Sequence, residues 1–238
     1  EFLVDKNGGY YFIEMNPRIQ VEHTVTEMVT GIDLVRAQLL IASGVPLSHP
    51  EIDLGDQRAL EMNGYAIQCR VTTEDPANNF APDNGKISAY RSGGGFGVRL
   101  DGGNAAAGSV ISPYYDSLLV KVTCWDRTFE ATCRKARRAI NEEHVRGVKT
   151  NIPFVTNILS HPTFIAGQCH TRFIDATPEL FDITAAKDRA TRVLKYIAGI
   201  QVANPDAERR KYDTPHYPEP SRPVTADMGL KHILDTQG

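Results

Sequence analysis

The sequence has 238 residues, of which 41% are hydrophobic and 23% charged, so it can bury one large or two smaller cores. A formal net charge of -3 and a pI near 6.2 give no general attraction to nucleic acid or to an anionic membrane surface. We therefore expect a globular protein with no nucleic-acid or membrane partner.

Cysteine spacing and hydropathy indicate a reducing, aqueous compartment. The four cysteines show no CxxC spacing, which favours reduced, buried thiols over disulfides or a zinc site: Cys69, Cys124, Cys133 and Cys169. No apolar run reaches the ~18 residues of a membrane span, and the first residues do not resemble a signal peptide. The chain opens without Met on a strand-like segment, so we expect a piece of a larger soluble protein.

The first elements along the chain are a hairpin and a helix. Residues 1–22 alternate in a strand-like way around Asn7-Gly8-Gly9, which predicts a turn. Thr24 followed by Glu27 reads as a capping box that opens a helix. The apolar positions after it keep helical spacing, and we expect this helix to run to Ser43.

The middle of the chain predicts an antiparallel sheet and then helices. Between residues 63 and 125, short strand-like runs alternate with Gly, Pro, Asn and Asp clusters. The later elements are predicted in this order: helices near 128–143 and 151–160, an unassigned segment at 171–175, a helix at 187–198, a proline-rich extended linker at 204–224, and the start of another helix at 228.

The hairpin carries a candidate metal site. If Lys6–Gly9 form its loop, the strand register puts Glu1 directly opposite Glu14. Opposed like charges destabilise a strand pair, so a divalent cation between them is expected, Mg²⁺ or Mn²⁺. Asn16 follows on the same face and offers a further oxygen. The alternative is an exposed hairpin with frayed charges.

A polar stripe continues from this site. Even positions from Glu14 to Glu22 lie on one face if the chain stays extended. Arg18 has the planar fork that suits a small oxyanion such as bicarbonate, and Gln20 is a donor beside it. Glu22 is then a candidate base for the bicarbonate proton. The alternative is a solvent-facing edge strand whose odd positions pack inward.

Residues 11–24, with the sequence YFIEMNPRIQVEHT, resemble the signature of biotin carboxylases, which have the ATP-grasp fold. The resemblance implies that Glu1 and Glu14 bind the metal with Asn16 adjacent. It also implies that bicarbonate is held by Arg18, Gln20 and Val21, and that Glu22 deprotonates it.

Two later stretches, residues 94–99 and 113–119, resemble the C-terminal part of biotin carboxylases. The resemblance gives Arg99 the role of stabilising the enolate-like oxygen of biotin as its ureido nitrogen loses a proton. Without the resemblance, residues 92–97 read as a Gly-rich turn.

The stretches 146–154, 171–181 and 188–191 resemble the pyruvate carboxylase family more than other biotin-dependent carboxylases. In that family, ATP and bicarbonate carboxylate biotin, and pyruvate is then converted to oxaloacetate. The resemblance implies ATP, Mg²⁺ or Mn²⁺, biotin on a separate carrier domain, acetyl-CoA as an activator that Arg189 contacts, and a tetramer. A basic cluster at 134–138 is a second effector candidate or, more simply, a solvated helix face.

Together these features predict an α+β fold with three parts. They are the end of an ATP-grasp domain (1–57), the C-terminal domain of a biotin carboxylase (58–166), and a linker, allosteric and tetramerisation region (167–238) that leads to a carboxyltransferase domain. We expect this chain alone to be inactive, and the parent to be cytoplasmic, or mitochondrial in an animal. The rival readings are an acetyl-CoA, propionyl-CoA or urea carboxylase, and a non-catalytic assembly or effector-binding module.

Overall fold

A computed structural model describes residues 1–103, 105–183, 193–194 and 196–199. The chain divides into two units, Glu1–Thr184 and Ala185–Gly238. In the second unit, 193–194 and 196–199 are helical, as predicted for 187–198. Arg189, the 204–224 linker and the helix from Met228 lie outside the described residues. In the part of the chain that is described, no helix is long and apolar enough to cross a membrane.

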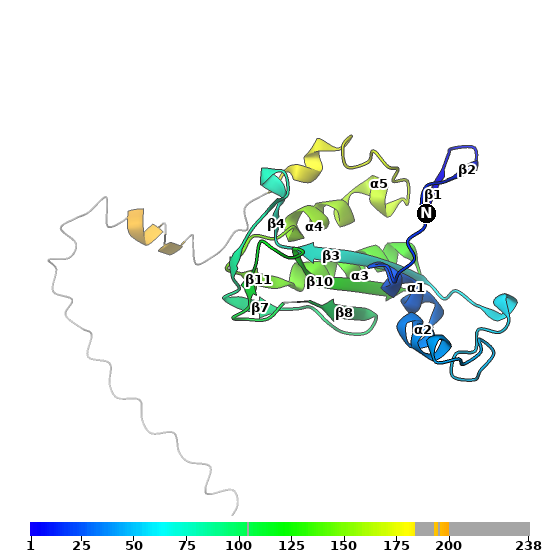
Figure 1. The fold of residues 1–238 in the computed structure, drawn as a ribbon. Helices are drawn as coiled ribbons and strands as arrows, with labels where there is room; N and C mark the ends of the chain where they lie inside the picture. The colour runs from blue at the N-terminus through cyan, green and yellow to red at the C-terminus, as the bar shows by residue number, and fades with distance from the viewer. Residues whose placement is uncertain (104, 184–192, 195, 200–238) are drawn as a thin grey trace, which may run out of the picture. The chain divides into compact units, whose positions relative to one another are not determined.

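The first unit begins with the predicted hairpin, which is followed by two helices (Figure 1). Strand β1 (Phe2–Val4) pairs with β2 (Tyr10–Phe12), and helices α1 (His23–Thr30) and α2 (Leu34–Ala42) come next. A 3₁₀ turn, η1, covers Gln57–Ala59. The prediction of one continuous helix to Ser43 is therefore wrong, because residues 31–33 are not helical and separate α1 from α2. Gly31 has a φ of 73°, a left-handed conformation that ends α1.

The predicted capping box at the start of α1 is also wrong. Glu22 occupies the N-cap position without a side-chain hydrogen bond, and Thr24 lies inside the helix, fully buried. Its hydroxyl is 2.7 Å from that of Thr123 in the sheet. A side-chain N-cap is found instead at the start of α2, where the Asp33 carboxylate accepts a hydrogen bond from Arg36 N at 2.8 Å.

The centre of the unit is an antiparallel sheet, as predicted for residues 63–125. Its strand order is β3 (Tyr65–Thr72), β10 (Leu118–Asp126), β8 (Val98–Gly102). Three short antiparallel pairs surround it: β4 (Glu74–Asp75) with β5 (Ala81–Pro82), β6 (Gly85–Lys86) with β9 (Val110–Ile111), and β7 (Ala89–Arg91) with β11 (His144–Arg146). A 3₁₀ turn, η2, covers Pro76–Asn78.

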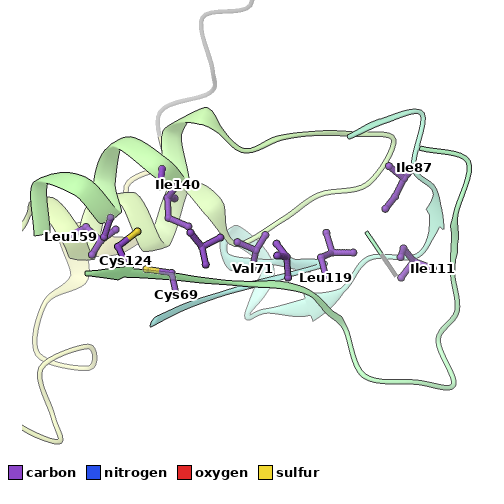
Figure 2. Close-up of a cluster of buried hydrophobic side chains, with 12 residues drawn as sticks. Cys69, Val71, Ile87, Ile111, Leu119, Cys124, Ile140 and Leu159 are labelled. Atoms are coloured by element: carbon purple, nitrogen blue, oxygen red, sulfur yellow. The ribbon is translucent and has the colours of Figure 1, made fainter. Parts of the chain in front are cut away.

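Two helices pack on this sheet where the sequence predicts them, α3 (Phe129–Glu142) and α4 (Ile152–Ser160). The short α5 (Pro162–Ile165) and the 3₁₀ turn η3 (Pro178–Phe181), which were not predicted, pack against α4. The Thr128 hydroxyl caps α3 by accepting a hydrogen bond from Ala131 N. Figure 2 shows the core between α3 and the sheet, whose labelled members include Val71, Leu119 and Ile140. This arrangement confirms the α+β class.

The segment that the sequence left unassigned, 171–175, consists of turns packed against α4. Phe173 is 7% exposed and shares a cluster of buried side chains with Phe154 and Leu180. The amide of Asn157 in α4 also donates a hydrogen bond to the Leu180 carbonyl at 2.9 Å. This tail therefore continues the core without forming a long helix or a strand.

Candidate functional site

The hairpin closes in a different register from the predicted one. Phe2 pairs with Phe12, and Asp5 N donates to Gly9 O at 2.8 Å, so the loop has three residues. Ile13 N correspondingly donates to Glu1 O at 2.8 Å. Glu1 therefore lies opposite Ile13, and the predicted opposition to Glu14 is wrong by one residue.

The two carboxylates nevertheless share one partner. The amide nitrogen of Asn16 donates to Oε1 of Glu1 and to Oε1 of Glu14, both at 3.0 Å. The three predicted metal-binding side chains thus converge at the open end of the hairpin. If the Asn16 amide is turned over, its oxygen faces the carboxylates and the site offers hard oxygen ligands.

This set of donors fits Mg²⁺ or Mn²⁺ as a shared site. Among the described residues, no cluster of three or more His, Cys, Asp or Glu side chains could hold a metal ion. Mg²⁺ is commonly held by one or two carboxylates while waters and substrate phosphates supply the other ligands. Glu1, Glu14 and Asn16 match that kind of binding in chemistry and in number.

Beyond Asn16 the predicted polar stripe does not exist as a strand face. Residues 13–22 are irregular and turn, with Arg18 N donating to Asn16 O at 2.8 Å and the Arg18 guanidinium to Ile19 O at 3.2 Å. Ile19, which would pack inward in the alternative of a solvent-facing edge strand, is 41% exposed. The polar and apolar residues of this segment alternate, but no neighbouring strand in the described part of the chain pairs with it, so nothing there keeps it extended.

The sheet, instead, anchors this segment. The Gln68 amide on β3 donates to Val21 O at 2.8 Å and to the Thr24 hydroxyl at 2.5 Å. The Thr24 hydroxyl also lies against that of Thr123 on β10. Thr24 and Thr123 are fully buried, so this polar network fixes the segment to the core. Sequence reasoning missed Gln68 and Thr123, although a polar residue within a buried strand was a usable signal.

The candidate base has an ionic partner that the sequence did not suggest. Arg70 Nη2 on β3 is 3.0 Å from Glu22 Oε2, and both side chains are 52% exposed. An exposed ion pair contributes little stability, about 0–1 kcal/mol. Its effect is to orient Glu22, whose other oxygen has no hydrogen-bond partner among the described residues.

Arg99 lies on β8 in a second group of charges. Its Nη1 donates to Glu27 Oε2 at 2.5 Å, while Nε and Nη2 donate to the two carboxylate oxygens of Asp101 at 2.8 and 2.9 Å. These hydrogen bonds to carboxylates raise the pKa of Arg99 above its usual range, against the effect of burial. The group lines an open depression of about 440 Å³ together with His23, Gly31, Ile32, Asp33 and Val35.

The structure therefore joins the predicted site residues by hydrogen bonds in three separate groups: Glu1–Glu14–Asn16, Glu22–Arg70 and Arg99–Glu27–Asp101. Arg18 bonds only to Ile19 O among the described side-chain hydrogen bonds. The Gln20 carbonyl accepts from the ring or backbone of His23, with the ring nitrogen at 2.6 Å.

The Gly-rich turn and the basic cluster have structural roles. Residues 92–97 connect β7 to β8, and Gly97 has a φ of 75°. A Cβ there would lie 2.6 Å from the Trp125 carbonyl, so the turn requires glycine. In the basic cluster, ion pairs join Arg134 to Glu130, Lys135 to Asp126, and Arg138 to Glu142. The charges of these three residues are compensated within the protein, which favours the interpretation of the cluster as a solvated helix face.

Comparisons with known proteins identify relatives along the whole chain. The family described as the biotin carboxylase C-terminal domain matches residues 68–176, and the ATP-binding domain of the carbamoyl-phosphate synthase L chain matches residues 1–50. Pyruvate carboxylase of Bacillus subtilis is 51% identical over 243 aligned residues, covering 100% of this chain and 21% of the relative. That of Schizosaccharomyces pombe is 60% identical over 202 residues, covering 85% of the chain and 17% of the relative.

Solved structures give the same result. A variant of Rhizobium etli pyruvate carboxylase with the allosteric activator acetyl coenzyme-A matches 100% of this chain and 24% of that one, with a TM-score of 0.83 and 47% identity. The biotin carboxylase domain dimer of Hydrogenobacter thermophilus 2-oxoglutarate carboxylase, with MgADP and bicarbonate, covers 77% of this chain and 39% of that one, at a TM-score of 0.73 and 42% identity. The chain spans about a fifth of the length of its curated relatives. It belongs to the biotin-dependent carboxylases, and within them its sequence matches the pyruvate carboxylases.

Proposed function

We propose that this chain forms part of a pyruvate carboxylase, in which ATP and bicarbonate carboxylate biotin and the carboxyl group then passes to pyruvate at a separate site, giving oxaloacetate. The observation that carries the proposal is the anchoring of residues 18–24 on β3 and β10, because it presents Glu22 beside Arg70 at the edge of the core. The whole-length match with pyruvate carboxylases supports the choice of acceptor.

In this proposal Glu1, Glu14 and Asn16 bind one Mg²⁺ or Mn²⁺ ion together with the nucleotide. A cation held by these residues would supply neutralisation of phosphate charge, which favours attack by an anionic nucleophile. The requirement for a nucleotide ligand explains why two carboxylates and one amide are enough on the protein side.

Bicarbonate is bound by the Arg18 guanidinium, the Gln20 amide and the backbone at Val21, and Glu22 removes its proton. Arg70 holds one oxygen of the Glu22 carboxylate, which leaves the other for the proton. Arg18 must release Ile19 O or use its remaining N–H groups to bind the anion. Arg99 serves the second half of the reaction by donating hydrogen bonds to the biotin oxygen on which negative charge develops.

We further propose a division into an ATP-grasp part (1–57), a biotin carboxylase C-terminal part (58–166) and a linker and allosteric region (167–238). An acyl-CoA activator such as acetyl-CoA, contacted by Arg189, and assembly into a homo-oligomer belong to this proposal, as does a cytoplasmic or mitochondrial location. The Rhizobium etli pyruvate carboxylase, whose structure contains the allosteric activator acetyl coenzyme-A, supports the choice of activator, and the biotin carboxylase domain dimer of 2-oxoglutarate carboxylase supports the homo-oligomer. The 238 residues alone are expected to be inactive, since they span only about a fifth of the relatives.

The acceptor is tested with a full-length carboxylase polypeptide that contains this chain. Pyruvate, acetyl-CoA and propionyl-CoA are supplied separately with MgATP and labelled bicarbonate, and fixed label is counted. Label is expected in the product of pyruvate alone. Preference for an acyl-CoA would refute the pyruvate assignment and would leave the biotin carboxylase assignment standing. Absence of ATP cleavage, with binding of acetyl-CoA retained, would favour a non-catalytic effector-binding module.

A further inference from the structure

One buried carboxylate, that of Glu27, connects three elements of the first unit. Its side chain is 7% exposed. Oε1 accepts the backbone N–H of Leu34 at the start of α2, at 2.7 Å, and Oε2 accepts Arg99 Nη1 from β8 at 2.5 Å. The left-handed turn at Gly31 brings the start of α2 back to α1, where Glu27 lies. Glu27 thus links the helix that follows the signature segment to the strand that carries Arg99.

The hydrogen bonds of Arg99 determine what the pocket can still bind. A guanidinium has five N–H donors, and Arg99 uses three of them on Glu27 and Asp101. One N–H on Nη1 and one on Nη2 remain. A guanidinium held on two sides by carboxylates cannot swing, so the direction of these two donors is fixed.

The charge around Arg99 limits the kind of ligand. The depression is lined by one guanidinium and by the carboxylates of Glu27, Asp101 and Asp33, so its formal charge is -2 before any charge on His23. The His23 Nε2 lies 3.9 Å from Glu27 Oε2. A preformed anion such as phosphate gains little attraction from such a group. A neutral carbonyl oxygen can still accept the two free N–H groups.

We propose that Glu27, with Asp101, is a positioning residue that holds Arg99 as a fixed donor for a neutral urea-type carbonyl and keeps small anions off it. This inference rests on the proposed function, in which that carbonyl is the ureido group of biotin. Neither carboxylate touches the substrate; both act through Arg99.

The first test is kinetic. Full-length carboxylase containing this chain is prepared as wild type and as Glu27→Gln, which keeps an oxygen for Leu34 N but removes the charge facing Arg99. The kcat for carboxylation of free biotin is expected to fall roughly 10- to 100-fold, the effect of losing one charged hydrogen-bond partner, with the KM for MgATP within about twofold of wild type. A kcat within about twofold of wild type overturns the proposal.

The matched control is Glu130→Gln, which removes a carboxylate from an exposed arginine pair of similar length, 2.5 Å to Arg134, and is expected to leave kcat unchanged. If Glu27→Gln does not fold, Asp101→Asn takes its place, because the Asp101 side chain is 23% exposed and tolerates change more readily. The same loss of kcat is expected from it, and an unchanged kcat counts against the proposal.

The second test needs no activity and so separates this inference from the proposed function. The Arg99 Nη1–H signal of the 238-residue chain, which reports the hydrogen bond to Glu27, is followed by ¹⁵N NMR while inorganic phosphate is added. In the wild type the signal is expected to stay in place and to exchange slowly with water. In Glu27→Gln it is expected to exchange faster and to shift with phosphate. Phosphate binding at Arg99 in the wild type, or an unaltered signal in the variant, overturns the inference even if the enzyme carboxylates biotin.

Discussion

Glu143 is a buried carboxylate that should make the stability of this protein depend on pH near neutrality. It is 6% exposed, and its Oε2 has no hydrogen-bond partner among the described residues. Its Oε1 accepts only a long hydrogen bond, 3.3 Å, from Gly93 N in the Gly-rich turn. Burial raises the pKa of Glu143 from 4.5 to about 7, and the Gly93 hydrogen bond offsets only part of that rise.

The sign and size of the effect follow from this pKa. In the unfolded chain Glu143 ionises at its ordinary pKa of 4.5, whereas in the folded chain it stays protonated until about pH 7. Its contribution to stability is therefore fully present below pH 4.5 and is lost as the pH rises to about 7. A difference of about 2.5 pH units corresponds to about 3 kcal/mol, at 1.36 kcal/mol per unit.

The variant Glu143→Gln is neutral at every pH and keeps an oxygen for Gly93 N. Urea unfolding is followed by circular dichroism from pH 4.5 to 8. Across this range the free energy of unfolding of the variant should rise relative to that of the wild type by up to about 3 kcal/mol. Glu142→Gln is the control, because the neighbouring Glu142 is exposed and paired with Arg138, and its difference from wild type should vary little. If Glu143→Gln and wild type lose stability in parallel as pH rises, the reasoning is refuted.

Three further predictions concern the first unit. At pH 8, iodoacetamide should modify Cys169, the exposed cysteine, and should reach the three buried cysteines only after unfolding, as read by mass spectrometry. Gly147→Ala should lower the free energy of unfolding by more than about 2 kcal/mol, because its φ is 101° and a Cβ would lie 2.2 Å from the Lys86 carbonyl; Gly31→Ala, at φ 73° in open space, should cost about 1 kcal/mol. Ile140→Ala, at a fully buried position, should cost about 2–5 kcal/mol in urea unfolding.

The elements that the sequence predicted well are those set by local pattern. The helix predicted at 128–143 is α3, whose buried positions keep helical spacing and whose cap, Thr128, is a neighbour in sequence. The antiparallel sheet also follows from alternation and turn residues. In each case the deciding interactions lie within a few residues, so the sequence alone contains them.

One error arose where a distant contact decides, and another where a local turn is ambiguous. Thr24 has the sequence context of a helix cap, yet its hydroxyl bonds to Thr123, 99 residues away. The hairpin register turned on whether Gly9 belongs to the loop or to the strand, which Asn7-Gly8-Gly9 leaves open. A shift of one residue changes which side chain faces Glu1.

In the candidate site, too, local features could be predicted from the sequence and long-range contacts could not. Its signature residues could be named from one continuous segment, whereas the side chains that hold them could not. Arg70 reaches Glu22 over 48 residues, and Glu27 reaches Arg99 over 72. Local periodicity gives no information on pairs so far apart, and only the packing of α1 against the sheet, on β3 and β10, brings them together.

The most direct test of the account is the rate of bicarbonate-dependent ATP cleavage in a full-length carboxylase that contains this chain, comparing wild type with Glu22→Gln and with the surface control Glu130→Gln. The proposed base predicts a loss of roughly 100-fold or more in Glu22→Gln and no change in the control. A Glu22→Gln variant that cleaves ATP at the wild-type rate would contradict the assignment of the base and, with it, the proposed role of the segment anchored on β3 and β10.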